Sequence, residues 1–183
     1  YKGFEQGPIR PPSEAYSLLI RVTRNCPWNK CKFCPVYKGE KFSLRPAEHV
    51  KKDIDAIHRH IQALRGMSGG AGQISRDIDM YNSNLPATER QAFMAALNWY
   101  VAGMKSVFLQ DANSLIIKSR DMIDILRYLR EKFPGIVRIT SYARSHTVSR
   151  IKDEDLAART SAGANRHHIS PESGAEGGPA LTR

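Results

Sequence analysis

All three cysteines of this 183-residue chain lie between Cys26 and Cys34, in the pattern C-x4-C-x2-C. Disulfide frameworks normally use an even number of cysteines spread along a short secreted chain, so this cluster does not suit one. A structural zinc site normally has a fourth Cys or His ligand at matched spacing, and no obvious candidate accompanies Cys31. Three thiolates without a fourth ligand suit an iron–sulfur cluster with one iron open to another ligand. The pattern therefore favours an iron–sulfur cluster and leaves zinc as the alternative.

A short apolar segment leads into the cysteines. Residues 16–22 (YSLLIRV) carry one charge, Arg21, near their end. The length and composition of this segment predict a strand buried on both faces, as in a parallel sheet. The loop after such a strand is where α/β barrels place their chemistry, because the loops at the carboxyl ends converge on one mouth. The cysteine segment is thus predicted to be the functional loop.

Beyond the cysteines, helical periodicity alternates with short apolar segments. Apolar residues spaced three and four apart predict a long helix over residues 47–64. Strands alternating with helices indicate parallel βαβ units, so the fold class is predicted to be α/β. Further helices are predicted over residues 88–103, 121–133 and 153–162, and further strands over residues 106–109, 137–140 and 165–169.

Several connecting segments carry their own predictions. Residues 1–14 contain Pro, Gly and charges, and are expected to form an extended lead-in. Residues 66–73 (GMSGGAGQ) are glycine-rich and lack the lysine of a phosphate-binding P-loop, so this segment is predicted to be a flexible loop and not a nucleotide-binding site. Ser119 can cap the helix that follows it. Residues 176–183 are predicted to be a tail.

The cysteine segment and its flanks resemble the radical S-adenosylmethionine (SAM) superfamily. The matching residues are AYSLLIRVTRN, which runs into the cysteines, and Phe33, directly before Cys34. The usual spacing in that family is C-x3-C-x2-C, so this chain has one additional residue between Cys26 and Cys31. The resemblance covers roughly residues 15–175 and implies a partial radical SAM core domain, with residues 65–105 as an insertion that carries an additional helix.

The resemblance also implies an architecture. Radical SAM cores are parallel-stranded (β/α) barrels that normally have six βα units, and this chain supplies about four. The expectation is therefore a partial barrel of the radical SAM type, with its C-terminal part missing.

By the same resemblance, Cys26, Cys31 and Cys34 would bind three irons of a 4Fe-4S cluster, and SAM would chelate the fourth through its amino and carboxylate groups. An electron delivered to the cluster would cleave SAM into methionine and a 5′-deoxyadenosyl radical, which abstracts hydrogen from a substrate. The protein is thus expected to be a radical SAM enzyme. The sequence does not indicate its substrate.

The family places SAM contacts at the carboxyl ends of successive strands. Asn113 stands where a Gly-Gly-Glu-like stretch would put its Glu, and its side-chain carbonyl can accept a hydrogen bond from an amine. Asp and Asn are also common in ordinary turns. Arg144 could hold the SAM carboxylate through its planar fork, and Phe33 would lie against adenine. The full set of expected SAM contacts is Phe33, Asp111, Asn113, Ser141, Arg144, Glu172 and Ser173.

The chain is basic, with a formal net charge of +10. Such a charge is compatible with nucleic-acid binding, but aromatic and basic residues do not interleave in a recognisable RNA-binding motif. An ordinary solvated basic surface is the favoured interpretation. A zinc-stabilised nucleic-acid-binding module remains the alternative function. No apolar segment approaches the ~20 residues that span a bilayer, and clustered, reduced thiols suggest a cytoplasmic location.

Basic residues are dense around the cysteines, where only Glu40 opposes them. This local charge could dock an acidic external electron donor of the flavodoxin or ferredoxin type, since the cluster must be reduced from outside. A solvated loop surface is the plain alternative. The basic residues concerned are Lys30, Lys32, Lys38, Lys41 and Arg45.

Overall fold

The computed structural model describes residues 1–170, which form a four-stranded parallel sheet and six helices. The strands β1 (Leu18–Arg21), β4 (Ser106–Gln110), β5 (Arg138–Arg144) and β6 (Arg166–Ser170) lie side by side in that order. Their spatial order is also their order along the chain, and every neighbouring pair is parallel. All four carboxyl ends therefore meet at one edge of the sheet.

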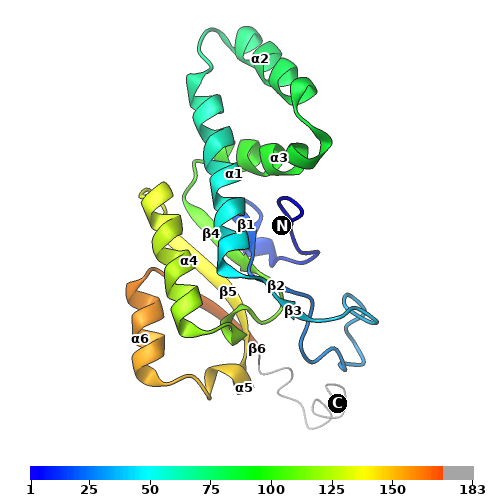
Figure 1. Ribbon diagram of the computed structural model, residues 1–183, viewed down its shortest axis with the longest axis vertical. Helices are drawn as coiled ribbons and strands as arrows, with labels where there is room; N and C mark the ends of the chain where they lie inside the picture. The colour runs from blue at the N-terminus through cyan, green and yellow to red at the C-terminus, as the bar shows by residue number, and fades with distance from the viewer. Residues whose placement is uncertain (171–183) are drawn as a thin grey trace.

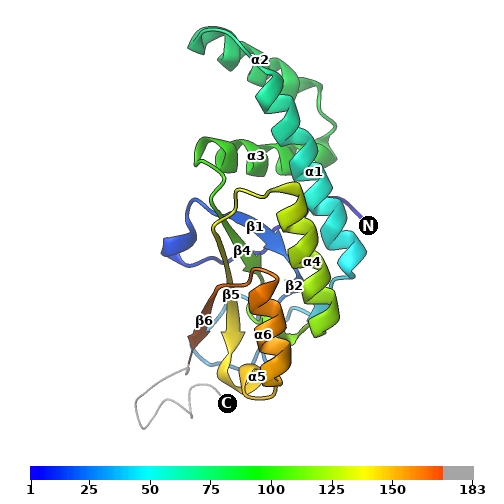
Figure 2. The ribbon, with the colours of Figure 1, turned by 90° about the vertical axis from the view of Figure 1, so that its left-hand side faces the viewer.

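The helices α1, α4 and α6 cover one face of this sheet, as Figures 1 and 2 show. The opposite face carries the N-terminal segment with its short 3₁₀ helix η1 (Pro12–Glu14). The helix bounds are α1 Ala47–Gly66, α2 Ala71–Asn84, α3 Ala87–Val101, α4 Ser119–Lys132, α5 Ser145–Val148 and α6 Asp153–Ser161.

The hydrophobic core lies between the sheet and its helices. Alternate strand residues such as Ile20, Leu109 and Ile139 point into it, where they pack with the apolar stripes of α1 and α4. Ile54 and Leu126 are fully buried members of these stripes. Burying a side chain of this size stabilises the fold by about 1.5–3 kcal/mol. The predicted α/β class and parallel sheet are confirmed, with each predicted strand and long helix present within a few residues of its expected bounds.

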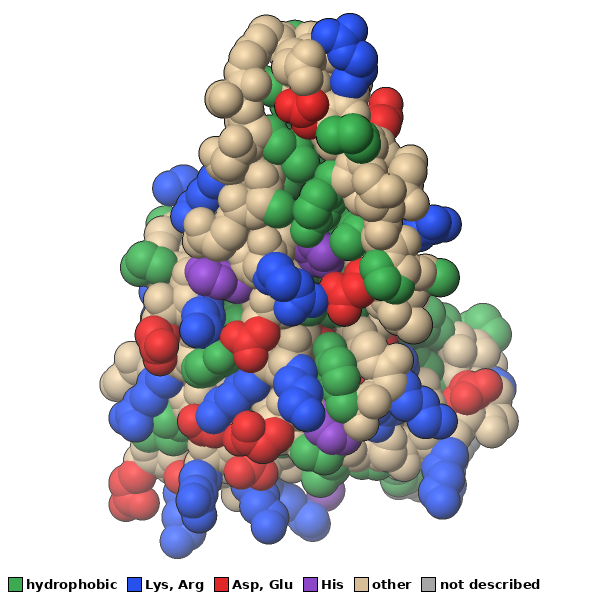
Figure 3. Space-filling model, turned by 45° about the horizontal axis from the view of Figure 1, so that its top comes forward, with side chains coloured by type: hydrophobic (Ala, Val, Ile, Leu, Met, Phe, Trp, Pro, Cys, Tyr) green, Lys and Arg blue, Asp and Glu red, His purple; other side chains and the backbone are tan. Residues whose placement is uncertain are grey.

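The glycine-rich segment predicted as a flexible loop, residues 66–73, is a connection only over residues 67–70, because α2 begins at Ala71. No helix was predicted over the residues that follow, and α2 continues through them to Asn84. Its residues Ile74, Ile78 and Tyr81, with Leu85 just beyond, repeat at helical spacing on one side. Ile78, Tyr81 and Leu85 are partly buried against the core, while α2 has no fully buried residue. The helix projects from the body, with hydrophobic side chains gathered on the inner side of the projection (Figures 1 and 3).

The prediction that Ser119 caps α4 is also wrong. The helix begins at Ser119 itself, its N-cap residue is Lys118, and no side chain caps it. The Ser119 hydroxyl instead accepts hydrogen bonds from Arg159 on α6, at 3.3 Å from Nε and 2.9 Å from Nη2. The Ser119 hydroxyl, which the local sequence predicted to be a helix cap, is therefore used in a tertiary contact with the buried guanidinium of Arg159.

None of the helices in residues 1–170 has the length and apolar character needed to cross a membrane.

Candidate functional site

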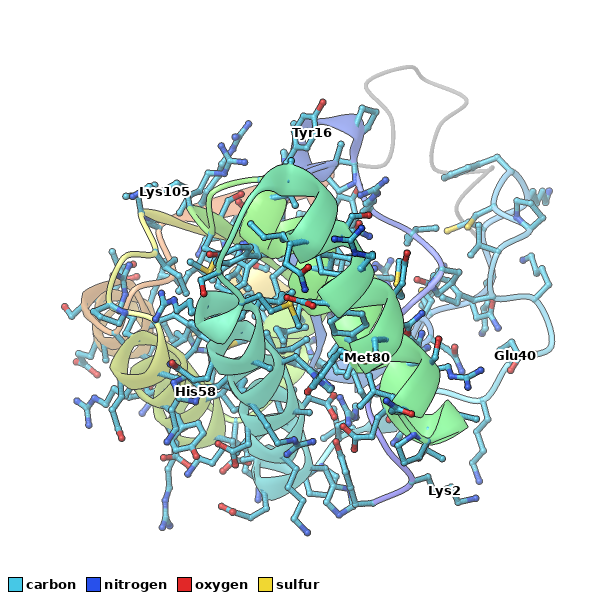
Figure 4. The ribbon with its side chains drawn as sticks, turned by 90° about the horizontal axis from the view of Figure 1, so that it is seen from above. Lys2, Tyr16, Glu40, His58, Met80 and Lys105 are labelled. Atoms are coloured by element: carbon cyan, nitrogen blue, oxygen red, sulfur yellow. The ribbon has the colours of Figure 1, made fainter. Side chains whose placement is uncertain are left out.

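The three cysteines lie in one loop at the carboxyl edge of the sheet. We call residues 25–42 the cysteine loop. It begins just after β1 and is closed at its base by a short antiparallel ladder of β2 (Thr23–Arg24) with β3 (Ser43–Leu44). Figure 4 shows Glu40 on this loop, which stands away from the helices. The predicted position of the cysteines, after the first strand, is the one that the structure has.

Cys26, Cys31 and Cys34 form no disulfide bond and are half-buried. The backbone N–H of Asn29 donates to Sγ of Cys26 at 3.4 Å. Across residues 1–170, no three His, Cys, Asp or Glu side chains are grouped so that they could hold a metal ion. The donors that a cluster needs are thus present in one loop, without being gathered around a common centre.

Asp111 connects the cysteine loop to the sheet. Its buried carboxylate accepts two N–H groups of Arg21 at Oδ2, from Nε at 2.9 Å and from Nη2 at 2.6 Å. The same oxygen accepts the backbone N–H of Asn25 at 2.9 Å, and Oδ1 accepts the hydroxyl of Tyr37 at 3.1 Å. The backbone N–H of Asp111 donates to the Thr23 hydroxyl at 3.2 Å. One carboxylate therefore joins the end of β4 to the end of β1 and to both sides of the cysteine segment.

The environment of Tyr37 follows from this contact. Burial raises the pKa of its hydroxyl, and the neighbouring carboxylate of Asp111 raises it further. Tyr37 is therefore neutral at physiological pH and acts as a donor to Asp111. Two features of the sequence hinted at the contacts of Asp111. They are the charged Arg21 near the end of an apolar strand and the aromatic Tyr37 after the cysteines.

The N-terminal segment, predicted to be a simple extended lead-in, is instead attached to this same edge. The side chain of Gln110 donates to the carbonyl oxygens of Gly7 at 3.2 Å and Ile9 at 2.6 Å, and accepts the Gly7 N–H at 2.8 Å. Gly7 lies so close to Asp111 that an added Cβ would sit 1.9 Å from Oδ1. Phe4 is buried in the core.

The ends of β4 and β5 also meet the cysteine loop. The side-chain carbonyl of Asn113 accepts the backbone N–H of Arg144 at 3.3 Å, and its amide donates to the Thr147 hydroxyl at 2.7 Å. The guanidinium of Arg144 lies 4.8 Å from the ring centre of Trp28, which belongs to the cysteine loop. The structure thus brings together the cysteine loop, Asp111, Asn113 and Arg144, four features that sequence reasoning grouped.

Other predicted SAM contacts lie apart from this group. Ser141 is buried and lies on the same face of β5 as Ile139 and Ala143, which pack in the core, and its hydroxyl lies 2.8 Å from Nδ1 of His167 on β6. Phe33 is in the cysteine loop with 56% of its surface exposed. Glu172 and Ser173 lie outside the described residues, as do residues 176–183, the predicted tail.

Arg45 does not belong to the exposed basic surface near the cysteines, contrary to expectation. Its side chain is fully buried and pairs with Asp53 at 2.6 Å and with Glu5 at 2.8 Å. Tyr1 completes this group by donating to Asp53 at 2.7 Å. The exposed residues form what we call the lysine patch: Lys30, Lys32, Lys38 and Lys41.

Comparisons of this chain with family models, with curated proteins and with solved structures found no match.

Proposed function

We propose that this protein is a radical SAM enzyme whose cysteine loop binds a 4Fe-4S cluster and whose strand ends bind SAM. One observation carries the proposal. The only three cysteines of the chain lie in a loop at the carboxyl edge of a parallel sheet, and that loop contacts Arg144 at the end of another strand through Trp28. Enzymes built on parallel strands and helices bind their ligands at this edge.

The sheet supports a partial (β/α) barrel. Strand order follows chain order and the helices α1, α4 and α6 lie on one face, as in singly wound barrels. In a doubly wound sheet the order would reverse at a switch point and helices would cover both faces. The face opposite the helices, where η1 lies, would then be the interior of the barrel.

The chemistry of the donors fits the proposed cofactors. Three thiols outside any disulfide suit an iron–sulfur cluster, and binding requires the loop to draw their sulfur atoms together. When bound, the cluster and SAM supply reductive SAM cleavage and a radical for hydrogen abstraction. Within the protein, Arg144 offers a charged fork to a carboxylate, and Asn113 orients it by accepting its backbone N–H. Phe33 offers an exposed ring for stacking on adenine.

Anaerobic reconstitution with iron and sulfide tests the proposal. We expect a brown protein with broad visible absorbance and about four irons per chain, as a 4Fe-4S cluster requires. Replacing Cys31 by Ala should abolish stable incorporation, while the matched change Ser75→Ala on the exposed side of α2 should not. Unchanged iron and sulfide content in the Cys31→Ala variant would exclude these thiols as ligands.

The same experiment addresses the zinc-stabilised nucleic-acid-binding alternative. A colourless protein that retains zinc through purification and takes up no iron would favour that module. Its basic surface should then bind nucleic acid with an affinity that falls steeply as salt rises. A cluster-bearing protein with no such binding would exclude it.

A further inference from the structure

We propose that Asp111 is the positioning residue of the cysteine loop, and that its contacts hold the cysteine segment on the sheet. The two loop donors flank that segment: Asn25 directly precedes Cys26, and Tyr37 follows Cys34 by three residues. The expected effect of Asp111 on cluster retention rests on the proposed function. The attachment of the loop to the sheet is independent of that function.

The loop's internal hydrogen bonds lead to the same two residues. The side chain of Asn25 donates to the carbonyl oxygen of Lys41 at 2.8 Å, near the far end of the loop. The side chain of Asn29, between the first two cysteines, donates to the carbonyl oxygen of Tyr37. Both halves of the loop are therefore tied to residues that Asp111 holds, so a change at Asp111 reaches the whole loop.

The contacts of Asp111 with Arg21, Asn25 and Tyr37 require an ionised carboxylate. The Asp111 side chain is fully buried, so its charge depends on compensation by Arg21, which is only 13% exposed and has a second, longer ion pair with Glu5 at 3.4 Å. An ionised carboxylate accepts at both oxygens, which lets one oxygen serve Arg21 and Asn25 while the other serves Tyr37. An amide in its place has one accepting oxygen and no charge.

This role differs from a direct contact with SAM. Both carboxylate oxygens of Asp111 already accept donors from the protein, and Gly7 packs against Oδ1. Asp111 therefore acts on the cofactor site through the loop that carries the thiols. Asn113 and Arg144 remain the strand-end candidates for SAM itself.

Limited proteolysis of the cluster-free protein tests the attachment directly. Trypsin can cut the cysteine loop after Lys30, Lys32 and Lys38, which are exposed. Asp111→Asn should raise the rate of cutting there about tenfold or more, since it removes a charge-assisted contact. Cutting after Arg76 on α2 should keep its wild-type rate, which separates release of the loop from general unfolding. Asp124→Asn, on the surface of α4, is the matched control and should cut as wild type does.

Tyr37→Phe is the second variant, because Asp111→Asn leaves Arg21 with Glu5, at 3.4 Å, as its remaining ion-pair partner and can fail to fold. It removes a single hydroxyl and leaves the Arg21–Asp111 pair intact. We expect faster cutting in the loop, by a smaller factor than for Asp111→Asn. Folded variants whose loop is cut at the wild-type rate would overturn the proposal, and if Asp111→Asn does not fold, Tyr37→Phe alone decides.

The cluster provides a separate readout. In reconstituted protein challenged with a chelator, Asp111→Asn should lose its visible absorbance about tenfold faster than wild type, with Asp124→Asn unchanged. If wild type takes up no cluster, the proposed function fails while proteolysis still decides the attachment. If wild type holds a cluster and Asp111→Asn releases it at the same rate, the positioning role is overturned and the proposed function stands.

Discussion

The guanidinium of Arg144 lies 4.8 Å from the ring centre of Trp28, and Nζ of Lys30 lies 5.2 Å from the same centre. Cations at such distances from an indole are attracted by the negative face of the ring. The Arg144–Trp28 contact joins residues that are far apart in the sequence, one at the end of β5 and one between the first two cysteines. It is the point at which the proposed cluster loop and the proposed SAM site meet.

Replacing Arg144 by Ala should weaken SAM binding while the cluster content stays at the wild-type level. Losing a charge-assisted pair costs ~1.5–3 kcal/mol, which is roughly a ten- to hundred-fold loss of affinity. Anaerobic calorimetry on reconstituted protein measures this loss. Arg127→Ala on the exposed side of α4 is the control. Equal SAM affinity in the Arg144 variant and wild type would remove Arg144 from the site.

The lysine patch should accelerate reduction by an acidic electron donor. Opposite charges steer association, and salt screens them as the Debye length falls from ~10 Å at 0.1 M to ~3 Å at 1 M. Reduction by flavodoxin or ferredoxin should therefore slow steeply with ionic strength, whereas reduction by dithionite should show no comparable loss. Stopped-flow absorbance of the cluster measures both rates.

Charge reversal locates this effect on the surface. Lys38→Glu together with Lys41→Glu should reproduce the high-salt rate at low salt. Lys105→Glu is the control, because Lys105 lies on the side of the molecule away from Glu40 and the cysteine loop (Figure 4). Donor-driven reduction that is indifferent to both salt and charge reversal would leave the lysine patch as ordinary solvated surface.

Gly7→Ala should destabilise the protein, because the new methyl group would sit 1.9 Å from Oδ1 of Asp111. Relieving that overlap requires the N-terminal segment or the buried carboxylate to move, and overpacking of this kind typically costs about 1–3 kcal/mol. Gly66→Ala is the control, since an added Cβ there meets no atom within 4 Å. Chemical denaturation measures both. A Gly7 variant as stable as the Gly66 variant would show that the N-terminal segment is not held against Asp111.

Acidification should loosen the attachment of α2 through His60. Burial lowers the pKa of His60, whose ring nitrogens lie 3.0 Å from the Tyr81 hydroxyl and 3.2 Å from Glu89. The unfolded chain binds a proton as pH falls through the ordinary His value of 6.5, before the folded protein does. Stability conferred by neutral His60 is therefore complete above pH 6.5 and is lost as pH falls below it.

Substitution isolates this contribution. His60→Gln should flatten the fall in unfolding free energy between neutral and mildly acidic pH. His167, whose pKa burial also lowers, would supply a remainder of the same sign. His58→Gln, the matched exchange at a half-buried position of the same helix, where the ring contacts Phe133, should leave the slope as it is in wild type. An unaltered slope in the His60 variant would refute the assignment.

The sequence predicted those helices and strands whose apolar residues repeat at the period of the element. The apolar stripe of α1 and the short strand β4 are readable because burial repeats at the helical or strand period. Helix α2 was missed because the glycines before it dominate the segment, although Ile74, Ile78 and Tyr81 keep helical spacing. A flanking glycine-rich turn is compatible with a helix that starts directly after it.

The sequence predicted which strand ends form the candidate site. It did not predict the hydrogen bonds and ion pairs that join their side chains. The cysteines, Asp111 and Asn113 follow strands, Arg144 is the last residue of β5, and parallel strands bring their ends together. The pairing of Arg21 with Asp111 spans 90 residues, and no local pattern selects that partner. The burial of Arg45 likewise depends on Glu5 and Asp53, which reach it from the N-terminal segment and from α1.

The attachment of the cysteine loop also sets an order of events during synthesis. Asn25 meets Asp111, a residue 86 positions later in the chain, so the loop leaves the ribosome long before its anchor exists. Until β4 has been translated and has paired with β1, the three thiols belong to an untethered stretch of nascent chain. The proposed cluster would therefore be inserted after β1 and β4 have paired, because only then are the thiols held at the edge of the sheet.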